Sequence, residues 1–174
     1  MIPVPVAVVG PSGAGKDTLM AMACASDAGI RAARRVITRP SQAGGEDFEG
    51  VTEAEFARRQ AAGEFLLHWR AHGLAYGIPA AAMAGEGVLL FNASRTALPE
   101  AARLLPGLRV LLVTAPPEVL AVRLAGRGRE GAEDRALRLA RADYPLPEGI
   151  AARTVMNDAT PEAGLARFMA ALQP

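Results

Sequence analysis

The fold is decided by the stretch Gly10-Pro11-Ser12-Gly13-Ala14-Gly15-Lys16-Asp17-Thr18, which directly follows the apolar run Val4–Val9. An apolar run that enters a glycine-rich loop of this spacing predicts a strand followed by a phosphate-binding loop. The glycines let the backbone curl until its N–H groups point at phosphate oxygens. Lys16 then opens a predicted helix, whose positive N-terminal end adds to the charge of the ammonium group. The expected ligand of these nine residues is ATP or another nucleoside triphosphate.

Asp17 departs from the usual pattern, in which a Ser or Thr after the lysine binds Mg²⁺ through its hydroxyl. A carboxylate can also serve Mg²⁺, directly or through water, and Thr18 offers a hydroxyl one residue later. Asp17 can instead be an ordinary acid in the first turn of a helix, where the helix dipole favours a negative charge. The sequence leaves both interpretations open. ATP and Mg²⁺ are the expected cofactors, with Asp17 as the candidate metal ligand.

The composition of residues 1–174 is that of one globular domain, with 51% hydrophobic and 5% aromatic residues. The formal net charge is only +1, and no basic stripe interleaves with aromatic residues, so no nucleic-acid partner is expected. The single Cys24 allows no internal disulfide, which suits a reducing cytoplasm. No apolar run approaches the roughly twenty residues that span a bilayer, so we expect a cytoplasmic protein without a membrane partner.

Short β-like runs alternate with helical segments along most of the chain. This alternation predicts an α/β fold of three layers, in which a mainly parallel five-stranded sheet carries helices on both faces. Ligands of such sheets gather at the carboxyl ends of the strands. The predicted strands are Val4–Val9, Arg35–Thr38, Gly87–Phe91, Leu108–Thr114 and Arg153–Met156.

The segment from about residue 38 to 79 interrupts the alternation and is predicted to be a small acceptor-binding insertion. We expect one helix over Glu53–Ala62, a β-like segment over Phe65–Arg70 and a turn at Tyr76-Gly77. Phosphoryl transfer needs an acceptor site that faces the nucleotide site. An insertion of this size beside the phosphate loop can provide it.

An arginine-rich segment with flanking glycines at about residues 126–137 is predicted to be a lid. A mobile lid would bring guanidinium groups to the charge that develops on the transferred phosphoryl group. The alternative is a solvated helix face on which acids and arginines pair. The candidate catalytic arginines of this region are Arg123, Arg127 and Arg138.

Candidate acceptor residues lie near the second predicted strand and within the insertion. Arg39 follows that strand directly, where a guanidinium group can hold a phosphate with two hydrogen bonds. Arg35, at the start of the same predicted strand, fits the pattern of a surface charge. His68 and His72 are four residues apart, but the residues around them alternate as in a strand, so a zinc site is not expected. For both histidines, a substrate contact and a structural role remain open.

Together these motifs resemble the guanylate-kinase-like group of P-loop kinases over nearly the whole chain. The matching segments are the phosphate loop, Thr38-Arg39-Pro40, Gly63-Glu64-Phe65, Tyr76-Gly77 and the lid arginines. The resemblance implies a three-layer P-loop kinase fold with a small acceptor-binding insertion and a lid. It also implies that Asn157, after the last predicted strand, lies where this group contacts the adenine of ATP.

The departures from guanylate kinases fall on the positions that bind GMP in that group. Leu67 stands where they have a guanine-binding Glu, Phe48 where they have a phosphate-binding Tyr, and Gln42 where they have a second acceptor arginine. A site that hydrogen-bonds its substrate rejects an analogue by a factor of about 10⁴ or more, and these polar partners are absent from this chain. GMP is therefore not the expected acceptor.

A narrower resemblance is to the ribose 1,5-bisphosphate phosphokinase family. It is carried by Lys16-Asp17-Thr18 and by segments 35–40, 43–46, 68–74, 76–79, 92–95 and 127–130. It implies ATP-dependent phosphorylation of ribose 1,5-bisphosphate to 5-phosphoribosyl 1-diphosphate (PRPP), with release of ADP, in phosphonate catabolism. The substrate-binding residues that follow from it are Arg39, Arg35, His68, His72, Tyr76 and Arg95.

Two other functions are compatible with the sequence, namely a nucleoside monophosphate kinase of the guanylate type and a non-catalytic binding module of the same fold. The complete phosphate loop and the lid arginines favour an enzyme, because a binding module has no use for them. Lys16 is expected on the β- and γ-phosphates, and no general base is required because the acceptor phosphate is already ionised. The sequence also allows a homodimer.

Overall fold

The structure is a computed structural model, which describes residues 2–43, 46–126 and 145–174. Its strands are β1 (Val4–Val9), β2 (Ile30–Ala32), β3 (Arg35–Ile37), β4 (Phe48–Gly50), β5 (Phe65–Ala71), β6 (Leu74–Pro79), β7 (Val88–Asn92), β8 (Arg109–Thr114) and β9 (Arg153–Met156). Its helices are α1 (Lys16–Ser26), α2 (Glu53–Ala61), α3 (Leu98–Leu104), α4 (Pro117–Gly126) and α6 (Pro161–Leu172). Short 3₁₀ turns are η1 (Ser41–Ala43), η2 (Ala80–Met83) and η3 (Arg95–Ala97).

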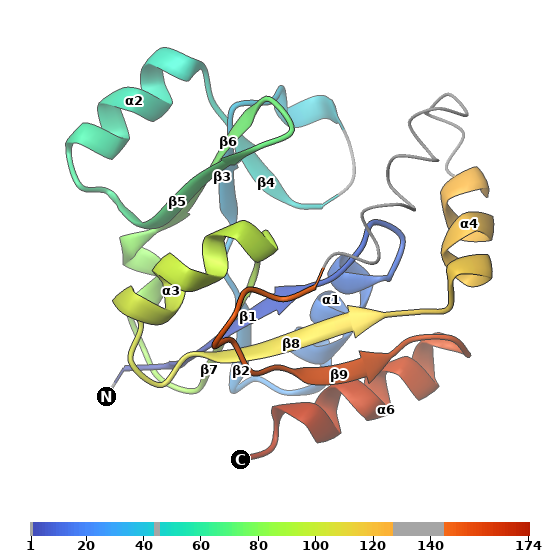
Figure 1. The fold of residues 1–174 in the computed structure, drawn as a ribbon. Helices are drawn as coiled ribbons and strands as arrows, with labels where there is room; N and C mark the ends of the chain where they lie inside the picture. The colour runs from blue at the N-terminus through green and yellow to red at the C-terminus, as the bar shows by residue number, and fades with distance from the viewer. Residues whose placement is uncertain (1, 44–45, 127–144) are drawn as a thin grey trace.

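The central sheet has five strands in the order β2-β7-β1-β8-β9, and every neighbouring pair is parallel. Strand β1 lies in the middle because its apolar run can be buried on both faces, and Val6–Val9 are fully buried. Helices α1 and α6 cover one face, and α3 packs on the other (Figure 1). The prediction of a mainly parallel five-stranded sheet with helices on both faces is confirmed.

One of the five predicted strands, however, does not belong to this sheet. Residues Arg35–Ile37 form β3 in a second sheet of four strands, in the order β4-β3-β6-β5. The edge strand of the central sheet is instead β2, which pairs with β7. The three residues Ile30–Ala32 are too short a run for periodicity to reveal, whereas the alternation argument assigned every longer run to a single sheet.

The predicted turn at Tyr76-Gly77 is wrong, because both residues lie inside β6. The chain turns at His72-Gly73, where φ is positive at both residues (53° and 74°). Strands β5 and β6 form an antiparallel hairpin around this turn. Glycine is needed at position 77 for a different reason, since the ring of Phe65 occupies the space that a side chain would fill.

The predicted helix and β-like segment of the insertion are confirmed as α2 and β5. Helix α2 begins after Thr52, whose Oγ1 accepts a hydrogen bond from the Glu55 N–H (3.1 Å). Phe56 stacks on Phe65 with ring centroids 4.6 Å apart, and both pack on Val36 of β3. Helix α2 therefore covers one face of the second sheet (Figure 1).

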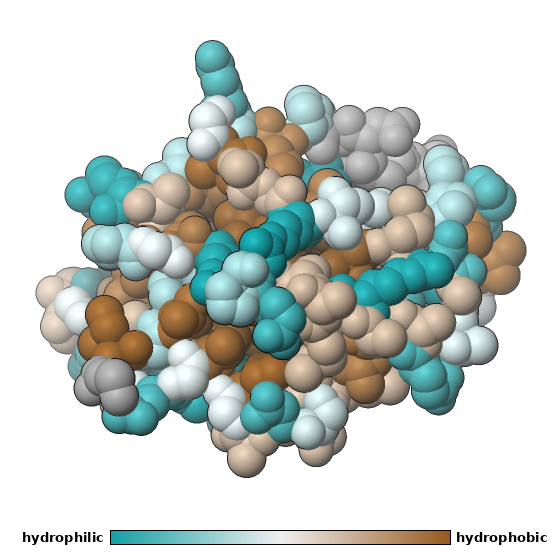
Figure 2. Space-filling view, turned by 90° about the horizontal axis from the view of Figure 1, so that it is seen from below, coloured by the Kyte–Doolittle hydropathy of each residue, from teal (hydrophilic) through white to brown (hydrophobic). Residues whose placement is uncertain are grey.

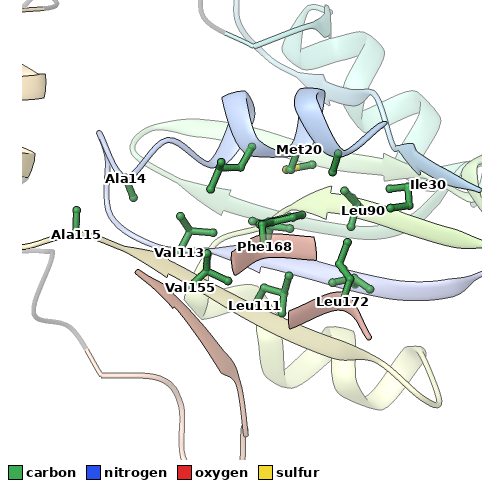
Figure 3. Close-up of a cluster of buried hydrophobic side chains, with 14 of the residues drawn as sticks. Ala14, Met20, Ile30, Leu90, Leu111, Val113, Ala115, Val155, Phe168 and Leu172 are labelled. Atoms are coloured by element: carbon green, nitrogen blue, oxygen red, sulfur yellow. The ribbon is translucent and has the colours of Figure 1, made fainter. Parts of the chain in front are cut away.

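The larger hydrophobic core fills the space between the central sheet and helices α1 and α6. Figure 3 shows Phe168 of α6 at its centre, among Met20 of α1, Leu111 and Val113 of β8 and Leu90 of β7. Phe168 is fully buried. Because α1 begins at the phosphate loop, this core fixes the loop to the carboxyl end of the sheet.

A second core lies on the opposite face and joins the two sheets. It packs Val9 and Phe91 of the central sheet against Leu67, Trp69 and Ile78 of the hairpin. Helix α3 closes this core with further buried apolar side chains. The insertion is therefore held against the central sheet by buried contacts, and its hairpin lies beside the phosphate loop.

The surface has few large apolar side chains in the part of the chain that the structure describes. Those that are exposed are Ile2, Leu104, Val122 and Met156, which lie on separate elements. On the face in Figure 2, hydrophobic residues form several groups between bands of hydrophilic ones. None of the described helices combines the length and the apolar character that crossing a bilayer requires.

Candidate functional site

The phosphate loop has the shape that its glycines predict. Gly10, at the end of β1, has φ of 146°, and a Cβ there would overlap the main-chain oxygen of Val113 in β8. Gly15 has φ of 89° and is the N-cap residue of α1. The Ala14 N–H donates to the Pro11 oxygen (3.3 Å), which closes the turn between the two glycines. Main-chain packing alone therefore excludes most side chains at Gly10.

Lys16 folds its side chain back over this loop. Its Nζ donates to the main-chain oxygens of Gly10 (2.8 Å) and Pro11 (3.1 Å). These bonds hold the ammonium group beside the α1 N-terminus, where two positive centres meet. A lysine ammonium group beside a helix N-terminus is an arrangement that can bind a polyphosphate.

Asn157 supports the loop from behind. Its Nδ2 donates to the Ala14 oxygen (2.8 Å), while its main-chain N–H donates to the Thr114 oxygen (2.8 Å). The side chain packs against Gly15 and against Gly164 of α6, and the residue is only 7% exposed. This burial leaves the Asn157 side chain little surface for the adenine contact that the resemblance implies. Its observed role is to brace the loop.

The neighbouring acid, Asp158, is more exposed and pairs with α6. The hydrogen bond from Arg167 (2.7 Å) lowers the pKa of the Asp158 carboxyl, and the charge of Arg123 adds a smaller effect in the same direction. Arg123 itself reaches the loop from α4, with Nη1 donating to the Gly13 oxygen (3.3 Å). Of the three candidate catalytic arginines, Arg123 therefore touches the phosphate loop. Arg127, Arg138 and the predicted lid lie outside the described residues.

Asp17 meets a polar partner that the sequence analysis did not identify as functional. The Nδ2 of Asn92, the last residue of β7, donates to Asp17 Oδ1 (2.8 Å). Asn92 is 8% exposed and is one of three buried polar or charged side chains among the described residues. Its position at the carboxyl end of a parallel strand next to β1 is the signal that could have revealed it.

Arg35 is buried (8% exposed) and is not the surface charge that its sequence neighbourhood predicted. Two nitrogens of its guanidinium group donate to the Glu46 carboxylate: Nε lies 2.8 Å from Oε2, and Nη2 contacts Oε1. Its Nη1 donates to the main-chain oxygen of Asn92 (3.3 Å), and the guanidinium lies 5.1 Å from the Tyr76 ring centroid. Arg35 thus joins the second sheet to the end of β7.

A cavity of about 640 Å³ opens between the phosphate loop and the hairpin. Trp69 and Tyr76 form one wall, with nearly parallel rings whose centroids are 5.4 Å apart. Four of the six predicted substrate residues line this cavity, namely Arg35, His72, Tyr76 and Arg95. Its other lining residues include Lys16, Trp69, Asn92, Ser94, Thr96 and Leu146. The cavity therefore lies between the phosphate loop and an aromatic wall.

A smaller, mainly polar pocket of about 250 Å³ adjoins this cavity at Lys16, Arg35 and Asn92. Arg39 lines this smaller pocket, with its guanidinium 4.4 Å from the Phe48 ring centroid. The other charged residues that line it are Lys16, Asp17, Arg35 and Glu46. Three cationic side chains can bind phosphate groups here, and Asp17 is a carboxylate that can serve a divalent cation, since Glu46 pairs with Arg35.

The two histidines both lie in the β5–β6 hairpin, but in different surroundings. His72 lies at its turn and lines the large cavity, whereas His68 is exposed and lines neither this cavity nor the smaller polar pocket. His68 instead lies near Glu100 of α3. The pKa of the Glu100 carboxyl is lowered mainly by its hydrogen bond from Arg103, and His68 contributes a smaller effect in the same direction. Among the residues that the structure describes, no group of three His, Cys, Asp or Glu side chains could hold a metal ion.

Leu67 cannot contact a base, because it is 1% exposed and packs in the core that joins the sheets. This agrees with the prediction that the pocket lacks the guanine-binding carboxylate.

Known proteins with similar sequences identify the family. Ribose 1,5-bisphosphate phosphokinase PhnN of Ruegeria sp. is 53% identical over 148 residues, which are 83% of this chain and 78% of that protein. The protein of the same name from Agrobacterium fabrum is 43% identical, over 97% of this chain and 95% of that protein. The chain belongs to the ribose 1,5-bisphosphate phosphokinase family. The predicted resemblance to this family is confirmed.

Some relatives are much longer than this chain. The bifunctional ribose 1,5-bisphosphokinase-thymidine phosphorylase of Cupriavidus necator is 53% identical over 171 residues, which are 95% of this chain but 28% of that protein. The chain therefore spans about a quarter of the length of these bifunctional relatives. No protein-family model matches the chain.

Solved structures support the fold. Guanylate kinase from Anaplasma phagocytophilum superimposes with a TM-score of 0.62 over 97% of this chain and 84% of that chain, at 19% identity. A gluconokinase from Sinorhizobium meliloti gives a TM-score of 0.58 at 15% identity, over 98% of this chain and 91% of that one. This chain thus has the P-loop kinase fold.

Proposed function

We propose that this chain transfers the γ-phosphoryl group of ATP to the anomeric phosphate of ribose 1,5-bisphosphate, with 5-phosphoribosyl 1-diphosphate and ADP as products. The observation that carries the proposal is the cavity between the phosphate loop and the hairpin. Lys16 lines it on the nucleotide side, while Arg35 and Arg95 line it on the other side. An acceptor that carries a phosphate can thus lie close to the γ-phosphate without a base-reading group.

On the nucleotide side, Lys16 binds the β- and γ-phosphates together with the N–H groups of the loop. Asp17 and Thr18 are the residues that would hold Mg²⁺, which when bound neutralises charge on the two phosphates. Arg123 already touches Gly13, which supports its role over the triphosphate. Arg127 and Arg138 are proposed to join it there.

On the acceptor side, the parallel rings of Trp69 and Tyr76 provide a flat apolar wall for the C–H face of the sugar. His72 and Arg95 line the same cavity and supply polar contacts for the hydroxyls and phosphates. Arg39 lines the small pocket beside Lys16, where it can bind a phosphate. The exposed position of His68 gives no support to a sugar contact.

The chemistry needs positioning and neutralisation of charge more than proton transfer. The attacking oxygen belongs to a phosphate that is already ionised at neutral pH, so no side chain has to remove a proton. It displaces ADP as the bond between the γ-phosphorus and the β–γ bridging oxygen breaks. In this proposal the step makes PRPP with ATP as the donor, in the cytoplasm and as part of phosphonate catabolism.

The test is a coupled assay of ADP release with Mg²⁺ and ATP. Ribose 1,5-bisphosphate, GMP, AMP and a sample without acceptor are compared, and the product is identified by mass. We expect turnover with the sugar bisphosphate alone and a product that contains one additional phosphoryl group. A Lys16→Ala sample prepared in the same way controls for contaminating kinases. Turnover with GMP, without turnover of the sugar bisphosphate, would overturn the substrate assignment.

A further inference from the structure

Two positions of the magnesium site depart from the usual P-loop pattern at the same time. P-loop enzymes hold Mg²⁺ with a Ser or Thr hydroxyl after the loop lysine and with an Asp at the end of a second strand. In this chain the residue after Lys16 is Asp17, and the end of β7 carries Asn92. The acidic side chain thus follows the loop lysine, where a neutral one is usual, and a neutral side chain ends the strand, where an acid is usual.

The two side chains are in direct contact. Asn92 Nδ2 donates to Asp17 Oδ1 at 2.8 Å. Asn92 lies opposite Val8 in the register of β7 with β1, and the next residue, Ala93, donates its N–H to the Val8 oxygen (3.1 Å). The strand that carries Asn92 is therefore the parallel neighbour of the strand that leads into the loop. This is the location from which a strand-end side chain can reach the loop helix.

Asn92 is also fixed by its surroundings. Its main-chain oxygen accepts a hydrogen bond from buried Arg35, and only 8% of the residue is exposed. A buried amide in such a position has few orientations available. Its donor group is therefore held towards Asp17, as outer partners hold the side chains that ligate metals.

The other carboxylate of the polar pocket is already used. Both oxygens of Glu46 pair with Arg35. For Asp17, by contrast, no ion pair with a described residue is found, and Asn92 is its hydrogen-bond partner. Asp17 is therefore the carboxylate of this pocket that remains able to serve a cation. Its place in the first turn of α1 suits a negative charge.

We propose that the acid and the neutral partner of the magnesium site have exchanged positions in this chain. Asp17 is the carboxylate that serves Mg²⁺, and Asn92 is a positioning residue that orients it from the end of β7. The exchange keeps a single carboxylate at the site, so the charge that faces the metal and the triphosphate is unchanged. The inference depends on the proposed function only in requiring that the loop binds a magnesium nucleotide.

The test moves the carboxylate back to the strand. Four proteins are compared: the natural chain, Asp17→Asn, the double variant Asp17→Asn with Asn92→Asp, and a control that combines Asp17→Asn with Ser94→Asp. The replaced side chains at positions 17 and 92 are isosteric, so the hydrogen bond between them can form in either direction. Ser94 lies two residues beyond Asn92 and lines the large cavity, so the control adds the same charge nearby.

The readout is equilibrium binding of the non-hydrolysable ATP analogue adenylyl imidodiphosphate, by calorimetry, with Mg²⁺ and with a chelator. The dissociation constant with the chelator is divided by the dissociation constant with Mg²⁺. This ratio reports how much Mg²⁺ strengthens nucleotide binding, and no acceptor is present in the sample. We expect Asp17→Asn to lower this ratio at least about 10-fold, since the loss of a metal ligand should cost no less than the loss of an outer partner. The double variant with Asn92→Asp should recover the ratio to within about threefold, whereas the Ser94→Asp control should not.

The exchange would be overturned by an unchanged ratio in Asp17→Asn, or by a double variant that binds no better with Mg²⁺ than Asp17→Asn does. Thermal melting of all four proteins verifies that each is folded. Recovery by the Ser94→Asp control to the same extent would also contradict it, because the gain would then reflect charge alone. Failure of the proposed function would appear elsewhere, as absent turnover of ribose 1,5-bisphosphate by a natural chain with normal magnesium-dependent binding.

Discussion

The two halves of the candidate site are built in different ways. The nucleotide half is a run of nine consecutive residues whose shape is set by main-chain geometry, as at Gly10 and Gly15. The acceptor half is assembled from side chains on separate elements, with Arg35 on β3, Trp69 on β5 and Tyr76 on β6. The first half allows little substitution at Gly10, because a Cβ there collides with the main-chain oxygen of Val113. The second depends on ion pairs and stacked rings, which can be altered one at a time.

The largest effect is expected from Lys16→Ala, on the nucleotide half. Removal of the ammonium group takes away a cation placed on the transferred phosphoryl group, and turnover should fall by about 10³-fold or more. Steady-state ADP release measures this. The Nζ hydrogen bonds to Gly10 and Pro11 are also lost, so a modest fall in melting temperature should accompany it. Turnover within tenfold of the natural chain would contradict the assignment.

The second prediction tests whether main-chain packing sets the loop. Gly10→Ala should destabilise the fold by about 4 kcal/mol, because the new Cβ meets the Val113 oxygen and φ is unfavourable. Gly63→Ala is the matched control, with φ of 71° and no atom within 4 Å of its Cβ position. It should cost only about 1 kcal/mol. Urea unfolding of both variants compares them, and equal costs would show that the overlap with Val113 is relieved.

The third prediction addresses the buried pair of the acceptor half. Glu46→Gln leaves Arg35 with a hydrogen-bond acceptor but without a compensating charge, and should destabilise the fold by about 2 kcal/mol. The KM for the acceptor should rise more than the KM for ATP. The control is Glu55→Gln in the exposed pair with Arg58 on α2, which should change both quantities little. If the two variants behaved alike, Arg35 would not need its partner.

The fourth prediction concerns the aromatic wall. Tyr76→Phe preserves the ring that stacks on Trp69 and should alter the acceptor KM by about threefold or less. Tyr76→Ala removes the stack and should raise that KM by about tenfold, with the KM for ATP nearly unchanged. Initial rates at varied acceptor concentration distinguish these cases. A larger effect of Tyr76→Phe than this would assign the binding to the hydroxyl instead of the ring.

The smallest effect is expected outside the residues that line the two pockets, at the exposed pair of Glu53 on α2 and Arg70 on β5. The hydrogen bond from Arg70 lowers the pKa of the Glu53 carboxyl. Its stabilising contribution is thus present above the unfolded-state pKa and is lost as the pH falls through the folded-state value. Arg70→Ala should return the Glu53 pKa towards its ordinary value, as NMR titration of the carboxyl carbon would show, with turnover unchanged. A Glu53 pKa that stayed low would exclude Arg70 as the cause.

The same contrast explains how much the sequence could predict. The phosphate loop and the central strands β1, β7 and β8 were found because each is a continuous pattern of glycines or apolar residues. Helix α2, which is mainly polar, and the short strand β9 were also predicted from their local sequence patterns. The contact between Asp17 and Asn92 spans 75 residues, and the pair of Arg35 with Glu46 joins β3 to a loop. No local spacing encodes such contacts. The placement of β3 in a second sheet was missed for the same reason, since pairing depends on distant strands.

The brace behind the phosphate loop also has a consequence for the order of folding. Asn157 contacts Ala14 across 143 residues of sequence, so this contact closes one of the longest loops available to the chain. Closing long loops costs entropy that must be spent before such a contact can stabilise anything, which delays it relative to local structure. Because β9 and α6 follow the phosphate loop in the chain, the loop's final shape therefore waits until these two elements have been synthesised and have docked.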